Sequence, residues 1–287
     1  MARSIVLNDG HRMPLIGLGT YKITGTTDVQ NCLDKALAVG YRLFDTAHMY
    51  KNETDIGEAL KVLLPKHQLT RSDVFITSKL FADETQTVVD GVTTSLQRLS
   101  MDYIDLMMIH SPAPSQSNCE TSENRKIRLN AWTALEQCKA AGQIRSIGVS
   151  NYEIRHIEEI LESSKTAPAV NQCECHPHFS RVPLRKYCTD KGIHFQAFAS
   201  LGRFNADLIA EPAILKVTDN HKASVEQVLL AWAMFHNVSV LPKSTNADRL
   251  AANFGSTRLQ LSDSEVATID ALNRDKPYTR CAGWLVP

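Results

Sequence analysis

The fold is decided by residues 40–50, which read Gly-Tyr-Arg-Leu-Phe-Asp-Thr-Ala-His-Met-Tyr. Within this stretch a short apolar run, Leu43-Phe44, ends on the carboxylate of Asp45, and the phenol of Tyr50 follows five residues later. Short apolar runs bounded by polar residues are typical of strands that are buried in a parallel sheet. Similar runs occur before and after this one, so the pattern extends along the chain.

Short apolar runs alternate with longer segments of helical period from one end of the sequence to the other. We expect eight strands, at Leu15–Leu18, Leu43–Phe44, Val74–Thr77, Ile104–Ile109, Ser146–Val149, Ala169–Gln172, His194–Phe198 and Val238–Leu241. Helices are expected between them, at Val29–Val39, Thr54–Leu64, Gln86–Leu99, Asn130–Ala141, Ile154–Ser163, Ser224–Phe235 and Ala247–Phe254. Three of these patterns are followed by a glycine where a C-terminal cap belongs, namely Gly40, Gly142 and Gly255.

The number of strand–helix units predicts an α/β fold. Eight units in one chain favour a (β/α)8 TIM barrel, and Ile5 to Leu15 predicts an N-terminal β-hairpin that turns at Asn8-Asp9-Gly10. No linker rich in Pro, Gly or Ser divides the chain, so we expect a single domain over residues 1–287. Periodicity alone leaves a doubly wound open sheet as an alternative.

The composition is that of an ordinary globular protein and excludes several kinds of partner. Of the 287 residues 43% are hydrophobic and 22% are charged, which argues against a disordered or collagen-like chain. The 31 basic and 31 acidic residues cancel, so no net field attracts nucleic acid or an anionic membrane. No apolar stretch is long enough to span a bilayer. We expect small molecules as partners and, without an extra apolar segment, a monomer.

The cysteines and the chain ends predict a cytoplasmic location. Seven cysteines, an odd number scattered along a chain too long to need disulfides, suit a reducing compartment. The first residues become polar too soon for a signal peptide, and the last four, Trp-Leu-Val-Pro, match no short targeting or lipidation tail.

Ionisable side chains stand at the ends of three successive predicted strands. Asp45, Lys79 and His110 are 34 and 31 residues apart, about the length of one βα unit. In a barrel the carboxyl ends of the strands form one face, where active sites are built. Adjacent strands would therefore bring these side chains, with Tyr50, to one rim. Later strand ends add further polar and aromatic groups to that face, at Ser150-Asn151, Gln172, Phe198 and Pro242-Lys243-Ser244.

These four side chains suit proton transfer to a substrate oxygen. Near pH 7 a phenol is a reluctant donor, and a nearby ammonium favours its phenolate form, so Lys79 would activate Tyr50. Asp45 would supply the countercharge that a partly buried ammonium needs. A neutral His110 beside the phenol would orient the substrate oxygen. The alternative for each residue alone is structural, as an ion pair, a packed ring or a satisfied histidine.

Other kinds of site lack their motifs. No His-x-His follows the first strand and no HExxH occurs, so we expect no metal. Cys173-x-Cys175-His176 lacks the two-residue gap and the second pair of a zinc knuckle, which favours buried small side chains. The absence of GxGxxG and Walker A motifs disfavours a Rossmann or P-loop nucleotide site.

Four motifs of the chain resemble those of the aldo-keto reductases, and the resemblance covers nearly the whole length. They are Gly40 to Glu53, similar to the first signature of the family, Phe75 to Leu80, Leu106 to Pro112, and Ile147 to Tyr152. The resemblance implies a (β/α)8 barrel that binds NADPH across its C-terminal mouth and reduces carbonyls by hydride transfer from the nicotinamide. It also implies that the catalytic residues are Tyr50, Asp45, Lys79 and His110.

The resemblance implies a cofactor site position by position. The residues that match the nicotinamide end are Asp45, Ser150, Asn151, Gln172 and, as a stacking ring, Phe198. Those that match segments on the pyrophosphate side are Gly19, Thr20, Tyr21, Ser200 and Leu201. Those that match the site of the adenosine 2′-phosphate are Lys243, Ser244 and Arg249, which implies NADPH rather than NADH, and Asn253 matches an adenine-binding amide.

The departures from the family pattern concern the substrate pocket. Tyr21, Phe81 and Ser111 stand where tryptophan is common, so the expected pocket has a thinner aromatic lining. With Tyr50, His110 and Trp284 they form the expected substrate-binding set. The segment from Gly202 to Glu211, which would fold over the pyrophosphate, is short. We therefore expect small or varied aldehydes and ketones rather than steroids.

Two other functions stay open on the sequence. Aldo-keto-like barrels can act as nicotinamide-binding regulatory or scaffold subunits, although the intact catalytic set counts against that function here. An alcohol or hydroxysteroid dehydrogenase that works in the oxidative direction would use the same catalytic residues.

Overall fold

The computed structural model describes residues 3–82, 87–113 and 121–279, and its strands form one hairpin and one eight-stranded sheet. The hairpin consists of β1 (Ser4–Val6) and β2 (Arg12–Pro14). The sheet consists of β3 (Leu18–Gly19), β4 (Leu43–Asp45), β5 (Phe75–Leu80), β6 (Ile104–Ile109), β7 (Ile144–Ser150), β8 (Val170–Glu174), β9 (His194–Phe198) and β10 (Ser239–Val240). The α-helices are α1 (Thr26–Val39), α2 (Glu53–Lys66), α3 (Val88–Leu99), α4 (Ser122–Ala140), α5 (Ile154–Ser163), α6 (Val182–Asp190), α7 (Ala206–Ile209), α8 (Pro212–His221), α9 (Val225–Phe235), α10 (Ala247–Gly255) and α11 (Asp263–Asp270).

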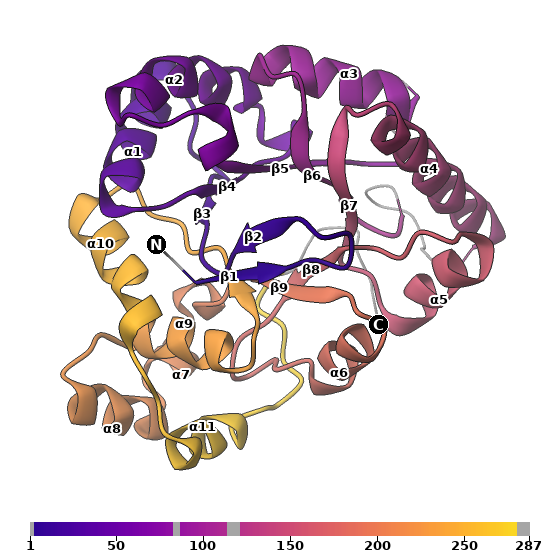
Figure 1. The fold of residues 1–287 in the computed structure, drawn as a ribbon. Helices are drawn as coiled ribbons and strands as arrows, with labels where there is room; N and C mark the ends of the chain where they lie inside the picture. The colour runs from indigo at the N-terminus through magenta and orange to yellow at the C-terminus, as the bar shows by residue number, and fades with distance from the viewer. Residues whose placement is uncertain (1–2, 83–86, 114–120, 280–287) are drawn as a thin grey trace.

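The sheet is parallel throughout and closes on itself. Strands β3 to β10 follow one another in chain order, each hydrogen-bonded to the next. Between the two ends Ile16 and Val240 form a parallel bridge, and the Gly17 N–H donates to Val240 O at 2.9 Å. The helices lie outside the ring of strands (Figure 1). The predicted barrel is confirmed, and the open-sheet alternative is wrong.

The N-terminal hairpin covers the amino-terminal end of the barrel (Figure 1). Its strands pair from Ser4 with Pro14 to Val6 with Arg12, as the sequence predicts. In the turn, Asp9 Oδ2 accepts from Lys139 Nζ at 2.6 Å, and Asn8 Nδ2 donates to Pro168 O at 2.9 Å. Because these partners precede β7 and β8, the hairpin lies at the end where the strands begin.

The inside of the barrel is packed with apolar side chains, and the polar residues at its carboxyl end lie on the same face of the strands. The cluster consists of Leu7, Met13, Leu43, Phe75, Leu106, Met108, Ala169, Val170 and Leu241. Side chains alternate between the two faces of a strand, so residues two or four positions beyond a lumen residue point the same way. Asp45 follows Leu43 at that spacing and Lys79 follows Phe75. The lumen is therefore apolar in its body and ionisable at its carboxyl end.

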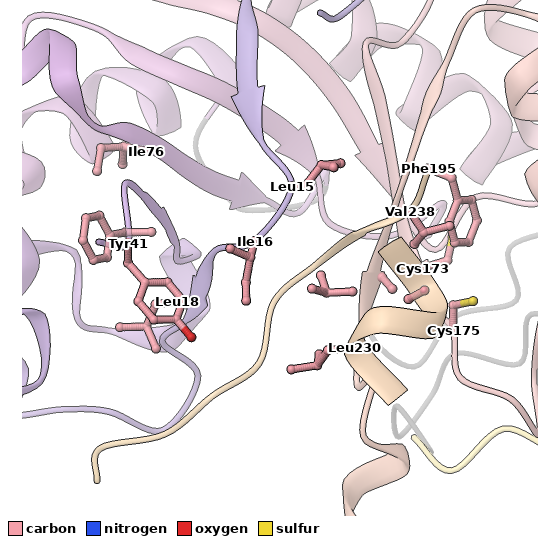
Figure 2. Packing of buried hydrophobic residues seen from close by; sticks show 14 of the residues in the cluster. Leu15, Ile16, Leu18, Tyr41, Ile76, Cys173, Cys175, Phe195, Leu230 and Val238 are labelled. Atoms are coloured by element: carbon pink, nitrogen blue, oxygen red, sulfur yellow. The ribbon is translucent and has the colours of Figure 1, made fainter. Parts of the chain in front are cut away.

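A larger apolar cluster fills the space between strands and helices. Figure 2 shows Leu18 and Tyr41 in one part of it and Cys173, Cys175 and Phe195 in another. Both cysteines are at most 1% exposed, which confirms that they are buried small side chains. No helix in the described ranges is both long enough and apolar enough to cross a membrane.

The secondary structure differs from the prediction in several details, and helices α6, α8 and α11 were not predicted. Helix α4 begins well before the predicted Asn130, at Ser122, where the Thr121 side chain accepts from the Asn124 N–H as a cap. Strand β3 is displaced toward Gly19. Gly255 has φ −59° and continues the helix into a 3-10 turn, so it is not a left-handed cap, in contrast to Gly40 at φ 118°. The predicted helix start at Gln86 lies outside the described residues.

Candidate active site

Three neighbouring strands carry charged or titratable side chains to the carboxyl end of the barrel. Asp45 lies opposite Thr77 in the register of β4 and β5, Lys79 lies opposite Met108 in that of β5 and β6, and His110 follows β6 directly. The exposed fractions of Asp45, Lys79 and His110 are 3%, 0% and 6%. The structure thus brings together the strand-end residues that the sequence places on one rim.

Lys79 is the centre of the hydrogen bonding. Its Nζ donates to Asp45 Oδ1 at 2.6 Å, to Thr46 O at 2.9 Å and to the Tyr50 hydroxyl oxygen at 3.4 Å. Burial lowers the pKa of Lys79 because the ammonium loses its hydration, and the carboxylate of Asp45 opposes that shift. An ammonium buried between a carboxylate and a phenol is a costly arrangement unless each partner is kept in place.

Tyr50 is held above the strand ends by a 3-10 turn, His48–Tyr50. The centroid of its ring lies 5.0 Å from Lys79 Nζ and 5.0 Å from the ring of Tyr21. The loop after it is fixed by the buried Asn52, whose Nδ2 donates to Ile23 O at 2.9 Å. The phenol therefore has a defined position beside the ammonium.

His110 lies in an aromatic setting beside Tyr50. Its ring stacks on Phe81 with the centroids 4.9 Å apart, and it meets the Tyr50 ring edge-on at 5.9 Å. Burial, and after it the positive charge of Lys79, hold the pKa of His110 well below its usual value. The imidazole is therefore neutral near pH 7 and can donate one N–H to an oxygen.

Asp45 joins this group to a second set of polar side chains. Its Oδ2 accepts from Gln172 Nε2 at 2.8 Å, and the same nitrogen donates to Gln196 Oε1 at 2.7 Å. Both N–H groups of the Gln172 amide are used, which leaves its carbonyl oxygen to accept. Sequence reasoning did not find Gln196. The only signal for it is an amide between the apolar residues Phe195 and Ala197 of β9.

The neighbouring strand ends extend this polar row. Ser150 Oγ donates to Gln172 O at 2.8 Å, and Asn151 Nδ2 donates to Ser150 Oγ and to His110 O, each at 3.0 Å. Asn151 adopts a left-handed φ of 62° directly after β7. Phe198 ends β9 and is partly exposed. Hydroxyl and amide groups and one aromatic plane therefore follow one another around the rim.

Two cations flank the start of α10. Lys243 and Arg249 are exposed, and no described carboxylate forms an ion pair with either. Arg249 Nε donates to Ser244 Oγ at 3.4 Å, and its N–H donates to the capping side chain of Asn246 at 3.0 Å. Asn253 is buried in the same helix. A helix N-terminus with two such cations favours a phosphate.

The segments at the end of β3 and after β9 contain buried residues. Thr20 is buried and donates to Asp45 O through its N–H at 3.0 Å and its hydroxyl at 2.8 Å. Gly19 has no room for a side chain, because a Cβ would lie 2.9 Å from Leu241 O. Ser200 and Leu201 are buried in the turn after β9.

The segment from Gly202 to Glu211 is compact. It forms a 3-10 turn, Gly202–Phe204, and the short helix α7, and Leu208 fixes it with a fully buried side chain. Phe204 in this segment is 55% exposed. The short length predicted from the sequence therefore corresponds to one packed turn of helix.

The residues predicted to line the substrate pocket lie at different depths. Tyr21 is 46% exposed, Phe81 is partly buried against His110, and Ser111 is 1% exposed, with a hydroxyl that donates to Ala113 O. Trp284 lies outside the described residues. Of these residues, a phenylalanine ring and a small serine thus stand beside His110. No group of three His, Cys, Asp or Glu side chains in the described ranges is placed to hold a metal ion.

Comparison with known proteins places the chain in a family. The profile of the Aldo/keto reductase family matches residues 15–274. The chain belongs to the aldo-keto reductase family. A glyoxal reductase of Bacillus subtilis is 34% identical over 275 residues, 95% of this chain and 94% of the relative. The human aldo-keto reductase family 1 member C1 is 34% identical over 298 residues, 96% of this chain and 92% of the relative.

Solved structures agree with this assignment. An aldo-keto reductase of Bombyx mori in complex with NADP superposes with a TM-score of 0.87 at 29% identity and covers 98% of this chain and 95% of that one. An aldo/keto reductase of Brucella melitensis gives a TM-score of 0.85 at 30% identity, with 95% and 100% covered. This aldo-keto reductase is therefore an oxidoreductase of the barrel type.

The neutral state of His110 makes a prediction for the pH dependence of this aldo-keto reductase. Because the pKa of His110 lies well below the ordinary 6.5, kcat/KM is expected to show no ionisation of this imidazole between about pH 6 and 8. Linkage gives the matching sign for stability. The neutral imidazole contributes its full share of stability above about pH 6.5. Below that pH the unfolded chain binds a proton that folded His110 does not, so the free energy of unfolding falls as the pH drops. An inflection near pH 6.5 that disappears in His110→Gln would contradict the prediction.

Proposed function

We propose that this aldo-keto reductase reduces small aldehydes and ketones to alcohols, with NADPH as hydride donor and Tyr50 as general acid. The observation that carries the proposal is the position of Lys79 Nζ, 2.6 Å from Asp45 Oδ1 and 3.4 Å from the Tyr50 oxygen. The relative named glyoxal reductase and the Bombyx mori structure in complex with NADP support the substrate class and the cofactor.

The rim fits a nicotinamide dinucleotide phosphate. The NH2 group of a carboxamide needs acceptors, which the side-chain carbonyl oxygens of Asn151 and Gln172, next to Ser150, offer because the N–H groups of both amides are already used. Phe198 offers an aromatic face for the ring, although it lacks a hydroxyl. When bound, the dinucleotide supplies the hydride that reduces the carbonyl carbon. At the far end the 2′-phosphate would meet the cations and the helix start of α10.

Tyr50 would deliver the proton. As hydride reaches the carbonyl carbon, negative charge grows on the substrate oxygen, and the Tyr50 O–H passes its proton to that oxygen. The phenolate left behind is stabilised by the ammonium of Lys79, 3.4 Å away. Asp45 keeps that ammonium compensated while its other oxygen holds the Gln172 amide. One carboxylate thus serves both the acid and the row of amides.

His110 would position the substrate. A neutral imidazole beside the phenol can donate one hydrogen bond to the carbonyl oxygen and so direct it at Tyr50. The stacked Phe81 ring fixes the plane of the imidazole, because the two rings are only 12° from parallel. Since the imidazole is neutral, it does not compete with Tyr50 as the proton source.

The expected substrates are small and reactive. The thin lining around His110, with Phe81 and the small Ser111 beside it, leaves few large apolar surfaces for a steroid. In a panel at equal concentration, kcat/KM is expected to be highest for glyoxals and nitrobenzaldehydes and at least about tenfold lower for bulky steroids. A steroid binds through burial of its methylene groups, each worth ~0.8 kcal/mol, and the thin lining leaves most of them uncovered. A panel led by steroids would overturn this assignment.

The two cations at α10 make a prediction for cofactor choice. Lys243→Ala combined with Arg249→Ala is expected to weaken NADPH binding about 10²-fold or more, because two charge-assisted hydrogen bonds to the 2′-phosphate are lost. NADH lacks that phosphate, so its Kd should change little. Fluorescence titration with both nucleotides measures the difference. Equal weakening of both would show that the phosphate is held elsewhere.

Loss of reduced-nicotinamide absorbance tests the proposed reaction directly. The protein is mixed with NADPH and a reactive aldehyde, and turnover is expected. Tight NADPH binding without consumption of any aldehyde would favour a nicotinamide-binding regulatory subunit instead. Faster NADP+ reduction with alcohols than NADPH oxidation with aldehydes at matched saturation would favour a dehydrogenase that works oxidatively.

A further inference from the structure

A cavity of about 240 Å³ lies at the amino-terminal end of the barrel, opposite the strand ends that carry Tyr50 and Lys79. It is lined by His11, Arg12, Pro14, Arg42, Ser72, Asp73, Val74, Phe75, Asp105 and Arg145. Phe75 begins β5, and Asp105 and Arg145 are the second residues of β6 and β7, so the wall is formed where strands start. The hairpin strand β2 supplies Arg12 and closes the other side.

Arg42 is fixed in place by one of its nitrogens, and its other N–H groups are free to donate. Its Nη1 donates to Tyr41 O at 2.7 Å and to Leu37 O at 3.1 Å. These are backbone carbonyls, so the positive charge of the guanidinium is not compensated by them. Its Nε and Nη2 have no hydrogen-bond partner among the described residues, and Arg42 is one of the residues that line the cavity. Arg42 therefore presents a rotamer-locked cation to this space.

Arg145 is fixed in a similar way. Its guanidinium carbon lies 3.7 Å from the centroid of the Tyr103 ring. The guanidinium carbon of Arg71 lies 4.1 Å from the same centroid. Arg145 Nη1 also donates to Asp105 Oδ1 at 3.4 Å. One nitrogen is thus engaged weakly, while stacking sets the plane of the group. The fork of Arg145 is preorganised for a planar or tetrahedral anion.

The carboxylates at the cavity are already satisfied. Asp105 Oδ2 accepts from Arg71 Nη2 at 2.6 Å and from the Ile76 N–H at 2.9 Å. Asp73 Oδ2 accepts from the Thr70 N–H and hydroxyl, each at 2.7 Å. With Arg71 included, four guanidinium groups, those of Arg12, Arg42, Arg71 and Arg145, face two carboxylates. The local excess is positive in a chain whose net charge is zero.

We propose that this cavity binds a small phosphate-bearing anion between Arg12, Arg42 and Arg145. Guanidinium forks match phosphate oxygens two at a time, and partly enclosed sites strengthen such hydrogen bonds relative to water. The volume suits inorganic phosphate or a small phosphate monoester and is too small for a dinucleotide. Arg12 belongs to the hairpin, whereas Arg42 and Arg145 lie at the starts of β4 and β7. An anion bound by all three would therefore connect the hairpin to the barrel.

Calorimetric titration of the full chain with inorganic phosphate, in a chloride buffer of low ionic strength, tests the proposal. Saturable binding is expected, and Arg12→Gln and Arg42→Gln should each weaken it at least about tenfold, because each removes charge-assisted hydrogen bonds. Arg12 is exposed and has no partner in the described part of the chain, so its variant should fold normally even if Arg42→Gln does not. Arg258→Gln, which removes an exposed guanidinium that does not line the cavity, is the matched control and should bind phosphate as the unaltered chain does.

A second arm with glycerol 3-phosphate distinguishes the two sources of the phosphate group. If glycerol 3-phosphate binds more tightly than inorganic phosphate, and Arg12→Gln weakens both equally, the ligand is a phosphate monoester. If glycerol 3-phosphate binds more weakly, the ligand is free phosphate. Absence of saturable binding overturns the proposal. Binding that survives both Arg12→Gln and Arg42→Gln but is lost in Lys243→Ala with Arg249→Ala overturns it as well, because the phosphate is then held at α10.

Discussion

Replacement of Tyr50 by phenylalanine is expected to lower kcat for aldehyde reduction roughly 10²- to 10⁴-fold, the range of a positioned general acid. The variant keeps the ring that lies 5.0 Å from Lys79 Nζ and 5.0 Å from Tyr21, so the packing of the site is retained. Only the hydroxyl is lost. NADPH affinity should stay nearly unchanged, because the Tyr50 hydroxyl is not among the groups that fit the dinucleotide. Steady-state kinetics and a fluorescence titration measure the two quantities separately.

Tyr187→Phe is the matched control for this prediction. It removes the same phenol oxygen from helix α6, away from the strand ends, and kcat is expected to stay within about twofold of the unaltered enzyme. Retained turnover in Tyr50→Phe would remove Tyr50 from the acid role and leave His110 as the remaining proton source. A loss of NADPH affinity as large as the loss of kcat would indicate a structural rather than a chemical role.

The positions of the charged strand-end residues could be predicted because they depend on local rules. Asp45, Lys79 and His110 are separated by one βα unit each, and alternation along a strand fixes which face each side chain takes. Asp45 and Lys79 also follow lumen residues at even spacing, which the sequence shows directly. Their meeting at one rim needs only that adjacent strands pair in order, and the structure has that order.

The partners of these residues could not be predicted, because they depend on closure of the barrel. Gln172 and Asp45 are 127 residues apart and meet through a hydrogen bond across the lumen. Gln196 orients Gln172 from a position between the apolar residues Phe195 and Ala197, where nothing in the local pattern marks it as part of the site. The arginines of the amino-terminal cavity lie on the hairpin and on separate strand starts, so no sequence motif unites them.

The second large effect is expected from the buried pair of Asp45 and Lys79. Removal of one partner leaves an uncompensated charge in a site where Lys79 is 0% and Asp45 3% exposed. Asp45→Leu is therefore expected to lower the free energy of unfolding by about 3–5 kcal/mol, and Lys79→Met by a similar amount. Urea unfolding followed by circular dichroism measures both, provided that each transition is two-state. Both single variants should lose most of the carbonyl reduction.

The double variant Asp45→Leu with Lys79→Met separates stability from chemistry. With both charges gone, no buried charge is uncompensated, so most of the lost stability should return, while turnover stays as low as in Lys79→Met. Lys61→Met breaks the exposed pair with Glu58, which is 2.7 Å long, and should change the free energy of unfolding by less than ~1 kcal/mol. If the double variant were as unstable as the sum of the singles, the pair would not be coupled in the folded state. Recovery of turnover with stability would show that the ammonium beside Tyr50 is not needed for proton delivery, and the proposed mechanism would be wrong.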